Sequence, residues 1–152
     1  TALSDYMESG LLHHLFRGTT FPKPENIALA LCSGVPQDSD TGSTIPELPT
    51  GINGSGTGYS DTILVIRLAL EIPRGIMTSM IIMLVAAKQK IGTWIFNTAL
   101  IDWGWVSGIA VMDSGEHGTG NLLMYAELGN PRIIYQGDAA KFDSSQLQIR
   151  FK

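Results

Sequence analysis

The amino-acid sequence predicts a mainly β domain, an antiparallel β-sandwich or jelly-roll-like fold with one N-terminal α-helix. Short apolar runs with alternating polarity recur along the chain, and this period of two is typical of strands with one buried face. Seventeen Gly and seven Pro supply turn signals between the runs. We expect residues 1–152 to form a single domain, because a chain of this length can bury a core without disulfides.

The N-terminal helix is expected over residues 4–17. Ser4 is a suitable N-cap, and Asp5 and Glu8 follow near the positive end of the helix dipole. Gly18 can close the helix. Apolar residues recur at helical spacing between these ends, at Met7, Leu11, Leu12 and Leu15.

A strand is predicted over Asn26–Ser33, in which large and small side chains alternate. One face carries Ile27, Leu29 and Leu31, and the other carries Ala28, Ala30 and Cys32. The small face predicts close packing against a neighbouring element. Since Cys32 is the single cysteine of the sequence, we interpret it as a small buried hydrophobe.

Residues 34–58 are predicted to form a long loop rich in Gly, Pro, Ser and Thr. Loops longer than about 15 residues are usually functional or disordered. Two interpretations stay open: the segment is an arm that reaches another subunit, or it is a surface loop.

The β core is predicted over residues 59–152. Polarity alternates regularly in Asp61–Ile72 and again in 147–151. The strongest hairpin pattern places the apolar runs Asp102–Asp113 and Gly120–Tyr125 around a short polar loop.

Two details of this hairpin are also predicted. Trp103 and Trp105 share a strand face in the pattern, so at least one of them is expected in the core. A turn is predicted at Asn130-Pro131, followed by a short strand over Arg132–Tyr135.

Charge and motif content argue against several functional classes. The net charge is −4 and the ten Lys and Arg residues are scattered, so we expect no nucleic-acid partner. The apolar run Ile76–Ala87 is shorter than the about 20 residues that cross a bilayer, so we expect no membrane insertion. The Gly-rich residues 51–58 lack the Lys-Ser/Thr of a phosphate-binding loop, and we expect no cofactor.

No catalytic or metal site is predicted. His13 and His14 are adjacent, so on a helix they diverge by about 100° and cannot face one metal ion together. A glycan-degrading enzyme would need two carboxylates about 5–10 Å apart in a cleft. Most of the acidic residues lie at turn positions, where Asp caps its own backbone.

The candidate binding residues are aromatic. Trp94, Trp105 and Tyr125 are interpreted as a glycan-binding platform, because exposed aromatic rings present flat apolar faces with polar edges.

Several segments, in order along the chain, resemble a family of tailed-phage virion proteins described as tail-fibre proteins. The N-terminal resemblance runs through Leu3–Glu8 and Leu11–Thr19, and Asn26–Cys32 follows. The C-terminal half is more similar, at Asp102-Trp103-Gly104, Gly120–Tyr125, Asn130-Pro131-Arg132, Gly137-Asp138 and Lys141-Phe142. The sequence departs from the family pattern over Ser60–Ile91.

The resemblance implies a β-rich, non-enzymatic subunit of a virus particle that binds copies of itself and other virion proteins of the capsid or tail. We expect the chain to form homo-oligomers in the virion. Two placements are compatible with a small β domain carrying an arm: a tail-fibre or tail-associated component, or a capsid decoration (cement) protein. The alternative function is a carbohydrate-binding module that recognises the host.

Overall fold

The computed structural model describes residues 2–48, 59, 62–64, 89–90, 94–142 and 148–149. Its elements follow in the order β1 (Ala2–Leu3), α1 (Asp5–Phe16), β2 (Ile27–Cys32), β3 (Thr62–Leu64), β4 (Gln89–Lys90), β5 (Trp94–Ile95), β6 (Gly104–Met112), β7 (Leu122–Ile134), β8 (Lys141–Phe142) and β9 (Gln148–Ile149). The predicted strand Asp61–Ile72 beyond Leu64, the apolar run Ile76–Ala87 and residues 49–58 of the predicted arm lie outside the described residues.

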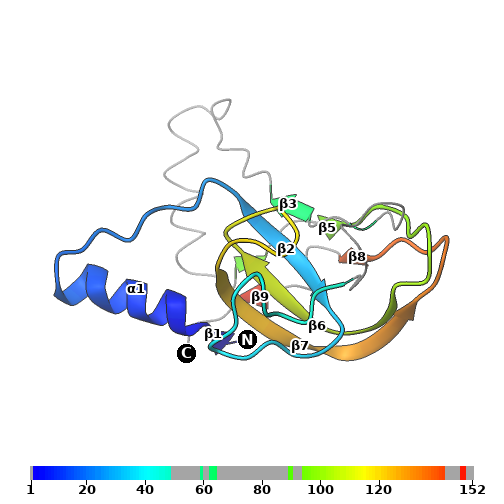
Figure 1. The fold of residues 1–152 in the computed structure, drawn as a ribbon, viewed down its shortest axis with the longest axis horizontal. Helices are drawn as coiled ribbons and strands as arrows, with labels where there is room; N and C mark the ends of the chain where they lie inside the picture. The colour runs from blue at the N-terminus through cyan, green and yellow to red at the C-terminus, as the bar shows by residue number, and fades with distance from the viewer. Residues whose placement is uncertain are drawn as a thin grey trace.

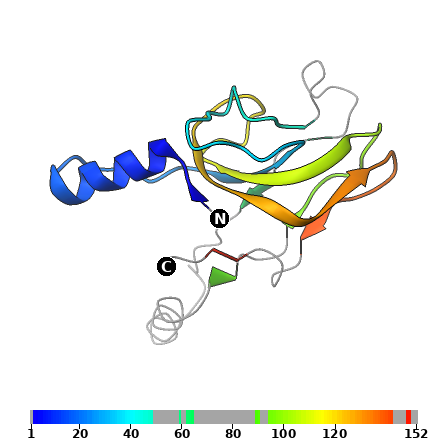
Figure 2. The same cartoon turned by 90° about the horizontal axis from the view of Figure 1, so that it is seen from below.

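Five of the described strands form one antiparallel sheet in the order β1-β7-β6-β2-β3 (Figures 1 and 2). Two short pairings, β4 with β9 and β5 with β8, accompany it. The mainly β class and the N-terminal helix are therefore confirmed. A second full sheet is not seen among the described residues, so the sandwich or jelly-roll arrangement stays a prediction.

Strand β2 separates two apolar clusters, as its alternation predicted. On one face, Leu29 and Leu31 pack with a cluster that includes Tyr59, Phe96 and Trp103. The other face buries the small residues Ala28, Ala30 and Cys32 with Ile45, Ala110, Met112 and Leu122. Ile45 belongs to the segment that follows β2, so this loop covers the small face of the sheet and completes the core there.

The long hairpin β6–β7 forms as predicted, but two of its details differ from the pattern. Gly104 has φ +84, in the left-handed region that glycine adopts without strain. This conformation interrupts the alternation, so Trp103 is buried while Trp105 pairs with Ile133 on the opposite, exposed side. The expectation that at least one tryptophan is in the core is correct, whereas the shared face is wrong.

The predicted turn at Asn130-Pro131 is also wrong. Strand β7 runs through these residues. On one side of them Glu127 pairs with Gly108, and on the other side Arg132 pairs with Val106, so β7 has more residues than β6 between the two pairs. The extra residues on β7 make a bulge, which accommodates a proline that has no N–H to donate to the ladder. The chain therefore keeps its direction and extends the sheet.

Candidate functional site: assembly surfaces

Helix α1 is anchored to the sheet at its first turn by Ser4. The Ser4 side chain accepts a hydrogen bond from the Met7 backbone N–H at 3.2 Å, which caps the helix. Its hydroxyl also donates to the Leu122 carbonyl, and its backbone N–H donates to the Leu123 carbonyl at 3.0 Å. Ser4 is fully buried, so one residue both starts the helix and holds it against β7.

A second anchor comes from the loop after β2. The Asp5 backbone N–H donates to the Asp38 carbonyl at 2.9 Å, and the Tyr125 hydroxyl donates to the Asp38 carboxylate. This hydrogen bond to a carboxylate, with burial and the negative charge of Asp38, raises the pKa of Tyr125 to about 12. The base of the helix is thus fixed by both β7 and the loop.

Beyond this base the helix projects away from the sheet, and both views show it standing clear of the strands (Figures 1 and 2). One side of the helix is covered by the returning chain. The Phe21 ring lies 5.8 Å from the Tyr6 ring, and a Cβ added at Gly10 would lie 2.1 Å from the Phe21 ring. The Phe21 backbone N–H donates to Nδ1 of His14 at 3.2 Å.

The other side of α1 is open, and no residue of the helix is buried. Leu12, Leu15 and Phe16 are 56 %, 70 % and 79 % exposed. The predicted apolar stripe is therefore present, but its C-terminal half faces solvent instead of the domain's own core. Large apolar side chains gathered on one exposed face are typical of an interaction surface.

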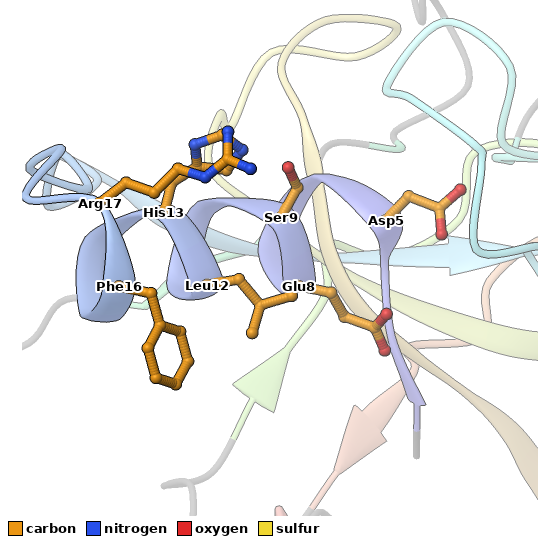
Figure 3. Close-up of a pocket in the computed structure, with 7 residues that line it drawn as sticks. All are labelled: Asp5, Glu8, Ser9, Leu12, His13, Phe16 and Arg17. Carbon is orange, nitrogen blue, oxygen red and sulfur yellow. The ribbon is translucent and has the colours of Figure 1, made fainter.

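This open face forms a shallow hollow lined by Asp5, Glu8, Ser9, Leu12, His13, Phe16 and Arg17. In Figure 3 the side chains of Glu8, Leu12 and Phe16 make one row, and those of Asp5, Ser9, His13 and Arg17 make another. We call these seven residues the open helix face. Its acidic residues lie at the start of the helix, its basic residues at the end, and its apolar residues between them and toward the tip.

A second exposed apolar surface lies at the end of the β6–β7 ladder. Trp105 is 50 % exposed and pairs directly with Ile133, which is also exposed. Tyr135 follows two residues later, past the buried Ile134, and is exposed too. Leu100 and Ile101 are exposed in the segment that hydrogen-bonds alongside residues 134–138. We call these five residues the sheet-end patch.

Sequence reasoning identified Trp105 in this patch but missed Ile133 and Tyr135. Their proximity depends on the register of a long hairpin with a bulge, which no local pattern gives. The Trp94 backbone lies in β5, and its side chain is outside the described part of the structure. Tyr125 pairs with Ala110 toward the other end of the ladder, so the described residues do not bring Trp105 and Tyr125 together.

The described half of the predicted arm, residues 34–48, packs on its own domain. Thr41 bridges Asn121, and the Gly42 backbone N–H donates to the Gly120 carbonyl at 3.0 Å. Buried Glu47 accepts hydrogen bonds from the Tyr59 hydroxyl at 3.0 Å and from the Gly118 backbone N–H at 3.4 Å. His117 Nε2 lies 3.7 Å from the same carboxylate. The loop is therefore locked to the β6–β7 hairpin.

Within the described ranges, no three His, Cys, Asp or Glu residues are grouped as metal ligands would be. The same residues contain no helix long and apolar enough to span a membrane. Charged groups instead cap turns or fix loops, as Asp113 does with the Asn121 backbone N–H at 2.6 Å.

Comparison with known proteins adds the identity of the family. Residues 2–51 and 85–150 match the family model described as podophage GP4 fiber I protein gp80. The unmatched residues 52–84 overlap the stretch Ser60–Ile91 where the sequence departs from the family pattern. A search of the curated proteins finds no match. The match gives no support to the capsid decoration role.

A family of this kind is generally structural and non-enzymatic, and its members are virion components. Well over half of the chain matches, including β2 and also the helix and the hairpin, which carry residues of the two exposed surfaces. The chain belongs to the podophage GP4 fiber I protein (Gp80) family and is a tail-fibre structural component of the virion.

Proposed function

We propose that this fibre protein assembles through copies of itself and through other tail proteins, using its exposed apolar surfaces as contacts. The observation that carries the proposal is the projecting α1, whose open helix face exposes Leu12 and Phe16 although the helix base is firmly anchored. An anchored helix loses little freedom on binding, and so more of its burial energy remains as affinity.

Composition supports the same role. Only 16 % of the residues are charged, against about a quarter in ordinary soluble domains. A virion subunit repeats each interface many times, so modest contacts sum to a stable assembly. Neither surface has to be large for the fibre to hold together.

The oligomeric state of the purified chain, measured by light scattering after size exclusion, tests this proposal. We expect a concentration-dependent oligomer, and we expect the chain to co-purify with tails after heads are removed. A chain that stays monomeric at all concentrations and is missing from purified tails would contradict the assembly role. Co-purification with heads alone would contradict the tail placement.

A second candidate function, host recognition through a glycan, is favoured by one observation. Trp105 and Tyr135 are both about half exposed in the sheet-end patch, which resembles the aromatic surfaces on which sugar rings stack. This pair replaces the predicted set of Trp94, Trp105 and Tyr125 as the platform to test. A glycan array probed with the intact chain and with Trp105→Ala separates the two functions, since no signal that depends on Trp105 would remove the recognition role.

A further inference from the structure

We propose that the open helix face of α1 binds the same face of a second copy of this chain, with the two helices antiparallel and a two-fold axis beside Leu12. This inference rests on the proposed self-assembly and identifies the surface that performs it. In such a contact, a residue away from the axis meets a different residue of the other copy and the same pair occurs twice, whereas a residue on the axis meets its own copy.

The distribution of charge on the open helix face makes it complementary to itself. Asp5 and Glu8 lie in the first turn, while His13 and Arg17 lie at the last. Antiparallel helices place the acidic start of each copy beside the basic end of the other. Parallel helices would place like charges side by side, which disfavours that arrangement.

The side-chain sizes define one register. If the overlap is centred between residues 12 and 13, Glu8 of one copy lies level with Arg17 of the other. Ser9 of one copy then lies level with Phe16 of the other. The large exposed Phe16 ring thereby meets a small residue, and two copies of Leu12 meet at the axis. The row of Glu8, Leu12 and Phe16 in Figure 3 supplies the ridge that such a pairing needs.

The position of α1 in the fold leaves room for this contact. The helix is anchored at its N-terminal end by Ser4, and its C-terminal end is the tip that projects farthest from the sheet (Figures 1 and 2). The proposed overlap involves residues 8–17, the outer part of the helix. In this arrangement the two described sheets lie toward opposite ends of the helix pair.

Reversing charges tests the register. Glu8→Arg and Arg17→Glu should each raise the dissociation constant of the dimer at least about tenfold, because each change creates two like-charge contacts. The double variant carrying both changes should restore the wild-type value. Glu25→Arg, a reversal outside the open helix face, is the matched control and should leave the dimer unchanged. Sedimentation equilibrium measures the dissociation constants of these four variants and of the wild type, and circular dichroism verifies that each variant is folded.

Cross-linking tests the axis independently. Leu12→Cys should form a disulfide-linked dimer on mild oxidation, whereas Phe16→Cys should not. In the proposed register the two copies of position 16 are about 10 Å apart along the helix axis, too far for a disulfide. The natural Cys32 is fully buried and does not compete.

Three outcomes separate this inference from the proposed function. Restoration by the double reversal, with cross-linking at position 12 only, supports antiparallel pairing. Oligomers that are indifferent to both reversals, or that cross-link equally at position 16, would overturn the pairing while leaving the assembly role intact. A chain that neither self-associates nor occurs in tails would overturn the proposed function itself.

Discussion

Replacing Tyr59 by Phe tests how the loop after β2 is held on the sheet. The Tyr59 hydroxyl accepts a hydrogen bond from the Leu31 backbone N–H at 3.0 Å and donates one to the Glu47 carboxylate at 3.0 Å. All three groups are buried. The substitution removes one oxygen atom and leaves the ring, which stacks on Phe96 and meets Trp103 edge-on at 5.3 Å.

The expected loss follows from what the missing oxygen leaves behind. A buried N–H without a partner costs about 1–3 kcal/mol, and a lost hydrogen bond to a charged group costs about 1.5–3 kcal/mol. Glu47 keeps its contacts with His117 and the Gly118 backbone N–H, which reduces the cost of losing its hydrogen bond from Tyr59. We therefore expect the free energy of unfolding to fall by about 2–4 kcal/mol, which lowers Tm by roughly 5–15 °C.

Urea unfolding followed by tryptophan fluorescence measures this loss, with an unchanged m-value as evidence that the unfolding reaction is the same. Tyr135→Phe is the matched control, because Tyr135 is exposed and its hydroxyl has no hydrogen-bond partner among the described residues. A loss below about 0.5 kcal/mol for Tyr59→Phe, equal to that of an exposed position, would refute the reasoning.

Three further predictions concern the loop and the helix base. In Asp38→Asn the pKa of Tyr125, about 12 in the wild type, should return toward 10, and near-ultraviolet absorbance titration measures this change. Because the pKa is higher in the folded state than in the unfolded state, the stability that Tyr125 contributes is complete below pH 10 and is lost as the pH approaches 12. Gly42→Ala should destabilise the fold by about 1–3 kcal/mol in thermal unfolding, since the added Cβ would lie 1.9 Å from the Thr119 carbonyl oxygen. Ser4→Ala should cost about 1–2 kcal/mol and reduce the helical circular dichroism signal, because the helix loses its N-cap.

Each of these predictions has a result that contradicts it. A tyrosine titration that is the same in Asp38→Asn and wild type would show that the carboxylate does not hold the hydroxyl proton. Gly129→Ala is the control for Gly42, since nothing lies within 4 Å of its added Cβ, and equal effects at both glycines would exclude a steric cause. Ser9→Ala is the control for Ser4, and equal losses there would mean that capping contributes nothing.

The sequence predicted elements well where the evidence was local. In β2 the alternation of large and small residues located the strand and assigned both of its faces. The helix boundaries were readable because Ser4 combines with early acidic residues and a late glycine, and Ser4 is indeed the N-cap. Such signals depend on residues close together in the sequence, so they do not require knowledge of long-range contacts.

The sequence predictions were wrong where a special backbone conformation or a residue distant in the sequence determines the local structure. The positive φ of Gly104 separated two tryptophans that simple alternation placed on one face. Asn130-Pro131 favours a turn in isolation, but pairing of β7 with β6 on both sides of this dipeptide holds it inside a bulge. Local propensity is the weaker effect here, because a reversal would break hydrogen bonds along the whole ladder.

The candidate site was the least predictable part for a related reason. Whether an apolar stripe faces its own core or another molecule depends on where the helix is attached, and Ser4 is attached to residues more than a hundred positions later. The same buried hydroxyl that makes Ser4 an ordinary N-cap in the sequence thereby directs Leu12 and Phe16 away from the sheet. A helix docked flat on the sheet would bury these residues, whereas a helix that the described strands hold at its first turn leaves them available to a neighbouring subunit. The anchoring of α1, more than the composition of its face, is therefore what makes this chain suited to assembly.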